Sequence, residues 1–110
     1  MNPTWLDTVQ DALSDKKAYD INVLDITGNS PLCDYFVIAS ASNVNQLSAI
    51  ADNVEEKLDE KGYTMKNREG RANGGWILLD YTDFVIHLFT EEMRSFYDLD
   101  HTWKDSSKLV

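Results

Sequence analysis

The chain has one cysteine, Cys33, and no long hydrophobic run. With a single thiol no disulfide can form within the chain, which suits a reducing cytosol. A membrane-spanning helix needs about 20 consecutive apolar residues, and no run in the sequence approaches that length. The first residues contain no lysine or arginine and carry an early acid, Asp7, which argues against a signal peptide or an organelle presequence. We therefore expect a cytoplasmic protein.

Basic residues are scarce as well. The 10 lysines and arginines stand against 19 aspartates and glutamates, so the net charge is −9. Direct recognition of nucleic acid is disfavoured, because affinity for phosphate groups comes from lysine and arginine. A basic protein partner would suit this charge. The alternative is that the acidity only keeps the protein in solution.

The residues that are present are those of an ordinary globular protein. Of the 110 residues, 43% are hydrophobic and 26% are charged. This length predicts one domain over residues 1–110, without a linker or an internal repeat. Apolar periodicity and turn residues predict the element order α-β-β-α-β-β-β-α. The expected elements are a helix from an Asn2 cap and Pro3 to about Lys17, strands at 20–26 and 34–40, a helix capped by Asn43 and Gln46 and ended by Gly62, an edge strand at 63–67, a loop at 68–75, a hairpin within 74–89 and a helix at 90–99.

Two features of this order predict a mixed sheet. The strand–helix–strand succession over residues 34–67 suggests a parallel crossover, and the hairpin adds an antiparallel pair. Together they make a sheet of about five strands with helices over at least one face. The expected fold class is therefore α/β or α+β.

The hairpin "GGWILLDYTDFVIHLF", residues 74–89, has one face that is harder to explain than the other. If its loop is Tyr81–Thr82, Asp80 lies opposite Asp83. Side chains alternate along a strand, so one face is wholly apolar and predicts core, with Ile77, Leu79, Phe84, Ile86 and Leu88. The other face carries Trp76, Leu78, Asp80, Asp83, Val85, His87 and Phe89. Exposed apolar groups with polar residues among them suggest a partner site.

Simpler roles remain open for these residues. Trp76 can be covered by the N-terminal helix, whose Trp5 also needs a place to pack. His87 has apolar neighbours on both sides and can be a hydrogen-bonded structural histidine. Asp80 and Asp83 can cap the turn through their own side chains. They can also hold a divalent cation, although two carboxylates without a third ligand are a weak metal signal.

No set of residues assembles an acid, a base and an orienting group, so we expect no enzyme activity, cofactor or metal. Gly28-Asn29-Ser30 resembles the Gly-Ser element of nucleotidyltransferases, but the next strand offers Asp34 alone where those enzymes need an acid pair. Cys33 has no base near it in the sequence, and a lone buried cysteine is usually inert. A nucleotidyltransferase-like protein that binds a nucleotide is the alternative.

Five segments, taken in order, resemble the ribosomal silencing factor family, also called the Iojap-like family. They are "DYFVIAS", "IADNVEEKLDEKG", "REG", "GGWILLDYTDFVIHLF" and "FYDLDHTW". The resemblance covers roughly residues 5–103, and the string W-x-L-L-D-Y-x-D-x-V-x-H-x-F is long and specific. It implies a mixed five-stranded sheet with flanking helices, nucleotidyltransferase-like in shape but without the catalytic acids.

The resemblance also implies a function. Members of this family bind the large ribosomal subunit through its ribosomal protein fourteen, and they sterically prevent the small subunit from joining, so translation falls when nutrients are scarce. An exposed apolar face would in addition suit a homodimer. One departure from the family is Thr82, where relatives often have glycine. Carried over to this chain, the partner-binding surface includes Trp76, Leu78, Asp80 and Tyr81, with Asp83 and His87 nearby. Arg94 and Tyr97 also match the family string R-x-F-Y. Phe96 and Tyr97 can equally be packing residues.

Overall fold

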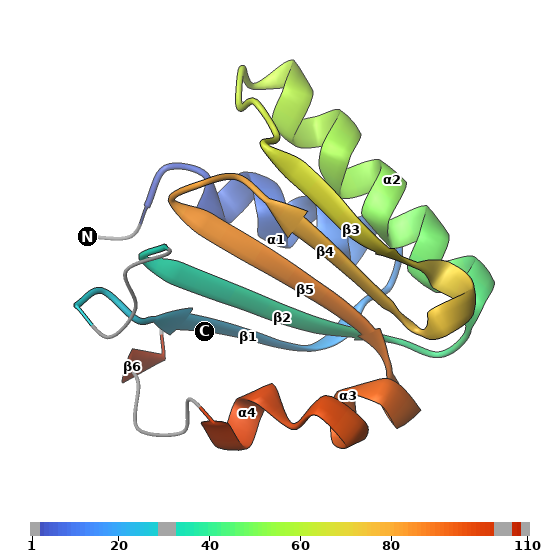
Figure 1. Cartoon of the computed structure of the whole chain (residues 1–110). Coiled ribbons are helices and arrows are strands. Elements are labelled where there is room, and N and C mark those ends of the chain that lie inside the picture. The colour runs from blue at the N-terminus through green and yellow to red at the C-terminus, as the bar shows by residue number, and fades with distance from the viewer. Residues whose placement is uncertain (1–2, 29–32, 103–106, 109–110) are drawn as a thin grey trace.

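The computed structural model describes residues 3–28, 33–102 and 107–108. Figure 1 shows the elements, which follow the predicted order α-β-β-α-β-β-β-α with three short additions, η1, α4 and β6. The predicted cap Asn2 lies outside the described residues, and α1 begins at Leu6 rather than Pro3. In chain order the elements are α1 (Leu6–Asp15), β1 (Tyr19–Asp25), β2 (Tyr35–Ala41), α2 (Val44–Glu60), β3 (Asn67–Arg71), η1 (Ala72–Gly74), β4 (Trp76–Asp80), β5 (Phe84–Thr90), α3 (Glu91–Tyr97), α4 (Leu99–Thr102) and β6 (Ser107–Lys108).

The strands form one mixed sheet in the order β3-β4-β5-β2-β1-β6. β2 and β5 pair in parallel, and the other neighbouring strands pair antiparallel. The predicted mixed five-stranded sheet is confirmed in β1 to β5, and the short β6 extends it at the β1 edge. α2 carries the chain from β2 to β3 at the opposite edge (Figure 1). The predicted crossover therefore passes over β5 and β4 instead of joining neighbouring strands.

The edge strand lies later in the chain than the sequence indicates. The predicted strand at 63–67 is wrong, because β3 covers Asn67–Arg71. Tyr63 and Met65 alternate as strand residues do, but both pack against the core under α1 and α2. β3 is exposed along its whole length and is held by backbone pairing with β4. A ladder of backbone hydrogen bonds needs no apolar side chains. A polar segment whose sequence predicts a loop can therefore form this strand.

α1 and α2 together cover one face of the sheet (Figure 1). Asn53 of α2 donates from Nδ2 to the carbonyl oxygen of Ala12 in α1 at 2.8 Å, which ties the two helices together. The predicted cap of α2 is confirmed, since Asn43 Oδ1 accepts the backbone N–H of Gln46 at 2.8 Å. Gly62 follows the helix in the left-handed region, as predicted. The core on this face includes Trp5, Leu6, Val9, Leu13, Val37, Leu47, Ile50, Val54, Leu58, Ile77, Leu79, Phe84, Ile86 and Leu88.

The second face of the sheet has a thinner cover. α3 and α4 run along it (Figure 1), and no residue of α3 is itself buried. Met93 of α3 and Leu99 of α4 pack against a small cluster on this face. The other members of the cluster are Leu24, Ile26, Cys33, Ile38 and Phe89, with Phe36, Trp76 and Val85 beside them. This is the face on which most of the predicted partner-binding residues lie.

Candidate functional site

The hairpin of β4 and β5 has a different loop from the predicted Tyr81–Thr82. Asp80 lies opposite Val85 and not opposite Asp83, so the assumed pairing is wrong by two residues on β5. The two residues at the tip are Thr82–Asp83. Because side chains alternate along a strand, a shift by an even number of residues leaves each side chain on its predicted face. The faces of β4 and β5 are therefore as the sequence indicates.

Trp76 and Leu78 lie half-buried on the face of the sheet that α1 and α2 do not cover. The ring of Trp76 lies beside that of Tyr97 in α3, with the ring centroids 6.0 Å apart. The alternative in which α1 covers Trp76 is wrong. Trp5 stacks instead on Phe84 at a centroid distance of 4.0 Å, on the opposite face. Trp76 and Leu78 consequently present apolar surface to a side of the molecule that no long helix protects.

His87 lies on the same face, opposite Leu78, and is only 8% exposed. Its ring meets Phe36 edge-on at 5.0 Å and is parallel to Phe89 at 6.1 Å. Neither Nδ1 nor Nε2 has a hydrogen-bond partner within the described structure. Burial lowers the pKa of His87 to about 4, so the imidazole is neutral near pH 7. The interpretation of a hydrogen-bonded structural histidine is wrong in one respect, since the ring is buried but unpaired.

Asp80 and Asp83 have separate roles at the tip of the hairpin. Asp80 Oδ1 accepts the backbone N–H of Thr82 at 2.8 Å, so the predicted capping of the turn is confirmed for this residue. Asp83 is exposed, and its carbonyl oxygen accepts the backbone N–H groups of Asp34 at 2.9 Å and of Tyr35 at 3.3 Å. These bonds fasten the tip of the hairpin to the beginning of β2. The two carboxylates do not face each other across the ladder.

Tyr81 turns to the opposite face, where its ring stacks on Phe84 at a centroid distance of 5.0 Å. Burial, with smaller contributions from Glu55 and Asp59, raises the pKa of Tyr81 to about 12. A groove of about 440 Å³ lies between this tyrosine and α2, and acidic side chains of α2 line it. Tyr81 therefore does not share a surface with Trp76.

α3 adds two aromatic side chains for which the sequence allows either packing or partner binding. Phe96 is 75% exposed and Tyr97 is 46% exposed. Tyr97 lies next to both Trp76 and Phe96, with ring centroids 6.0 Å and 5.4 Å away. The string R-x-F-Y holds this signal, but spacing along a helix does not tell which aromatic ring meets the core. We call the surface formed by Trp76, Leu78, Phe96 and Tyr97 the aromatic face.

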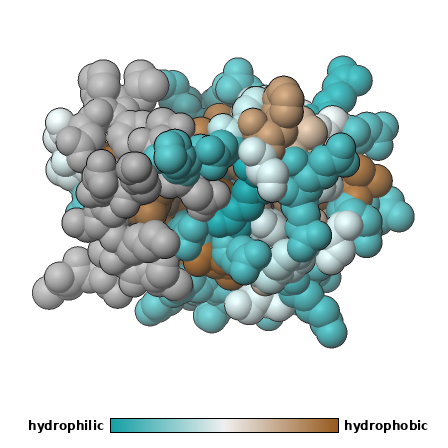
Figure 2. All heavy atoms as spheres, turned by 90° about the horizontal axis from the view of Figure 1, so that it is seen from below, coloured by the Kyte–Doolittle hydropathy of each residue, from teal (hydrophilic) through white to brown (hydrophobic). Residues whose placement is uncertain are grey.

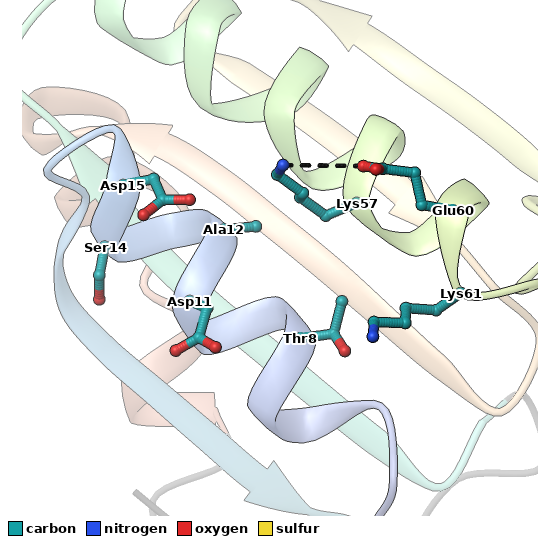
Figure 3. A pocket seen from close by; sticks show the side chains of 8 residues that line it. All are labelled: Thr8, Asp11, Ala12, Ser14, Asp15, Lys57, Glu60 and Lys61. Carbon is teal, nitrogen blue, oxygen red and sulfur yellow. Dashed lines mark ion pairs between the residues drawn. The ribbon is translucent and has the colours of Figure 1, made fainter.

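A groove of about 470 Å³ runs between α1 and α2 (Figure 3). Asp11 and Asp15 line it from α1, Lys57 lines it from α2, and Lys61 lines it from the residue that follows α2. Lys57 forms an ion pair with Glu60 at 3.7 Å. Charges of both signs on mostly exposed side chains are typical of solvated helix surfaces and add little stability. We interpret this groove as the water-facing seam between the two helices.

Two features of the described residues concern metal binding and covalent chemistry. Among these residues, no group of three or more His, Cys, Asp or Glu side chains is placed to hold a metal ion. Burial raises the pKa of the Cys33 thiol to about 11, so it is neutral and a poor nucleophile near pH 7. Asn29 and Ser30 of the nucleotidyltransferase-like segment lie outside the described residues. Within the described part of the chain, no helix is long and apolar enough to cross a membrane.

Comparisons with known proteins agree on one family. The family model described as "Ribosomal silencing factor during starvation" matches residues 2–110. "Ribosomal silencing factor RsfS" of Bacillus subtilis (strain 168) is 39% identical over 95 residues, which are 86% of this chain and 80% of that protein. "Protein Iojap, chloroplastic" of Arabidopsis thaliana is 33% identical over 96 residues, which are 87% of this chain and 40% of that protein. A crystal structure of a Chromobacterium violaceum protein is 31% identical and superposes with a TM-score of 0.86, covering 96% of this chain and 89% of that one.

Proposed function

The chain belongs to the ribosomal silencing factor family, as its sequence pattern predicts, and from that premise we propose that it binds the large ribosomal subunit and keeps the small subunit from joining. The point of contact is ribosomal protein fourteen of the large subunit. Occupation of that surface lowers translation when nutrients are limiting. The protein acts in the cytoplasm and carries out no reaction of its own.

The observation that carries this proposal is the aromatic face. Trp76 and Leu78 are half-buried, and Phe96 and Tyr97 extend the apolar surface onto α3. Contiguous apolar side chains at a surface mark interaction sites. Aromatic residues also supply much of the binding energy of protein interfaces. The net charge of −9 suits a basic partner, because complementary charge speeds association and disfavours wrong partners.

The predicted partner-binding residues take different roles in the proposal. Trp76 and Leu78 contact the partner directly. Asp83, exposed at the tip of the hairpin, meets basic side chains at the rim of the interface. Asp80 and Tyr81 act indirectly, by holding the hairpin in shape. Asp80 accepts the Thr82 N–H in the turn, and Tyr81 packs within the core on the other side of the sheet. The interface therefore depends on contact residues and on residues that hold the hairpin in shape.

His87 supports the same surface from the neighbouring strand. It lies on β5 opposite Leu78, and its ring packs between those of Phe36 and Phe89. Its two unpaired ring nitrogens lower the stability of the fold. A residue needed only for packing would carry no such penalty, and unsatisfied buried groups in proteins often accompany a functional role.

The proposed mechanism is steric. A protein that occupies the surface needed by the small subunit excludes that subunit by its volume, and mass action sets the blocked fraction. A homodimer formed through the aromatic face is a second arrangement that these side chains favour, and it would compete with ribosome binding. Light scattering at micromolar concentration distinguishes the two arrangements, because a measured mass of one chain would rule out the homodimer.

The variant Trp76→Ala tests the proposed surface. Loss of an aromatic anchor should weaken binding to isolated large subunits by about 2 kcal/mol or more, while the circular dichroism spectrum stays that of a folded protein. The control is Asp11→Ala, which changes the groove between α1 and α2 on the other side of the sheet and should keep wild-type affinity. A folded Trp76→Ala protein that binds as tightly as wild type would place the contact elsewhere.

A further inference from the structure

We propose that α3 is itself part of the docking surface, and that Phe96 is an anchor that inserts into a basic protein surface bearing arginine or lysine. This inference rests on the proposed function, because it adds α3 to the face that meets the large subunit. Four features of the described residues support it: exposure, continuity with Trp76, the fixed position of the helix, and the charge around it.

The exposure of Phe96 is not explained by folding. Among the described residues the exposed large hydrophobic side chains are Val44 at 38%, Tyr97 at 46% and Phe96 at 75%. Met93, on the same helix, packs against the sheet in the usual way. Phe96 instead leaves most of its ring in water, where it contributes little to stability. Burial of such a ring is favourable once a partner covers it.

The exposed ring of Phe96 is continuous with the rest of the aromatic face. Phe96 meets Tyr97 edge-on, with the ring planes at 87° and the centroids 5.4 Å apart. Tyr97 in turn lies 6.0 Å from Trp76 and 5.5 Å from the buried Phe89. A partner that contacts Trp76 on the sheet therefore finds Phe96 on the same surface.

α3 is held in a fixed position under the sheet. The backbone N–H of Thr90 donates to the carbonyl oxygen of Gly75 at 3.0 Å, just before the helix begins. Further along, Arg94 donates from Nη1 to the hydroxyl of Ser40 at 2.8 Å and also to the carbonyl oxygen of Asp20. An aromatic ring on an anchored helix loses less conformational freedom on binding than one on a loose segment.

The charges around Phe96 indicate a basic protein partner. Glu92, four residues before Phe96 and so one helical turn away, is exposed, and the chain as a whole carries a net charge of −9. Arg94, the helix's one cation, points inward to Ser40. Seen from the side of α3 and α4, the coloured residues are mostly hydrophilic (Figure 2). Aromatic rings beside carboxylates favour arginine and lysine, through stacking and charge together, and they disfavour the phosphates of RNA.

Affinity measurements on matched variants test the inference. The dissociation constant of isolated large subunits is measured for wild type, Phe96→Ala and Asp11→Ala. Phe96→Ala should raise the constant by about tenfold or more, as for interface hot spots, with an unchanged melting temperature. Asp11→Ala changes an exposed side chain of α1, in the groove on the other face of the sheet, and should leave both quantities unchanged. Addition of salt should weaken the wild-type complex, because part of the contact is between charges.

The outcomes separate this inference from the proposed function. If Trp76→Ala weakens binding and Phe96→Ala does not, α3 lies outside the interface, and the proposed function stands without it. If wild-type protein does not bind large subunits at all, both are overturned. Equal losses for Phe96→Ala and Asp11→Ala would show a non-specific effect of substitution and would also contradict the role of Phe96.

Cross-linking identifies what covers Phe96. The native thiol Cys33 is buried, so a thiol-directed photocrosslinker attaches selectively to a Phe96→Cys variant. In the presence of large subunits, the expected product joins this chain to a ribosomal protein, while an Asp11→Cys variant on the other face of the sheet gives no such product. A cross-link to ribosomal RNA, or to a second copy of this chain, would contradict the proposed occupant.

Discussion

Trp76 lies opposite Phe89 in the ladder of β4 and β5, and the ring of Tyr97 from α3 lies against both. The centroid of Tyr97 is 6.0 Å from that of Trp76 and 5.5 Å from that of Phe89. One cross-strand pair of the sheet is thus in contact with α3. Changes next to Trp76 should alter the aromatic face even when the changed residue is not part of it.

Gly70 in β3 leaves no room for a side chain beside Trp76. A Cβ atom at this position would lie 2.3 Å from the backbone oxygen of Trp76 and 2.7 Å from its ring carbon Cε3, and the backbone has φ +83°. Gly70→Ala should therefore lower the free energy of unfolding by roughly 2 kcal/mol or more and shift the tryptophan fluorescence. Chemical denaturation followed by fluorescence measures both effects.

Gly62→Ala is the matched control for this substitution. Gly62 also has a positive φ, +88°, but nothing lies within 4 Å of the Cβ position. Its alanine variant should lose only the backbone contribution, about 1 kcal/mol, with unchanged fluorescence. Equal losses in the two variants would show that contact with Trp76 contributes nothing at Gly70.

Thr82, at the tip of the hairpin, adopts φ +73°, which is unfavourable for a β-branched residue. Asp80 Oδ1 compensates in part by accepting the Thr82 N–H. Thr82→Gly keeps that hydrogen bond and relieves the strain, so it should raise the free energy of unfolding by about 0.5–1 kcal/mol. Thr82→Asn, which also tolerates this conformation, should act in the same direction. If urea denaturation gives both variants a lower free energy of unfolding than wild type, the claim that Thr82 is strained is contradicted.

The stability of the protein should depend on pH through His87. Its pKa in the folded state, about 4, lies below the ordinary value of 6.5. As the pH falls, the unfolded chain binds the proton first, so the contribution of His87 to stability is complete above about pH 6.5 and is lost as the pH falls toward 4. The loss at the acid end should be on the order of 3 kcal/mol. Urea titrations across this range measure it.

His87→Phe isolates this contribution from that of other groups. The variant keeps an aromatic ring among Phe36 and Phe89 and removes two unpaired nitrogens, so it should be more stable than wild type at pH 7 by roughly 1–3 kcal/mol. Its stability should also change less between pH 6.5 and 4. His101→Gln, at an exposed position in α4, is the control and should retain the wild-type pH dependence. A His87→Phe protein with the wild-type pH dependence would assign the loss to other residues.

Local pattern predicts much of this fold because the signals lie in the residues themselves. Asn43 and Gln46 make the expected cap of α2, and alternation alone places Trp76 and His87 on one face of the hairpin. The assumed loop is wrong, yet the faces are right because the shift is by two residues. A one-residue shift would have exchanged the faces.

The remaining features depend on tertiary contacts that no local pattern carries. β3, Asn67–Arg71, has no apolar alternation and forms because β4 offers it a backbone partner. The sequence predicts Tyr81 on one surface with Trp76, but the turn directs it to the α2 side of the sheet. The exposure of Phe96 follows from how α3 docks, since the same helix without the sheet gives no reason to separate Phe96 from Met93.

Sedimentation through a sucrose gradient tests the central claim most directly. Purified protein is mixed with isolated large and small ribosomal subunits under conditions in which the subunits join. The account predicts that the protein travels with the large subunit and that the joined-ribosome peak decreases as its concentration rises, with Trp76→Ala weaker in both respects. Protein that remains at the top of the gradient, or that binds while the joined-ribosome peak is unchanged, would contradict it.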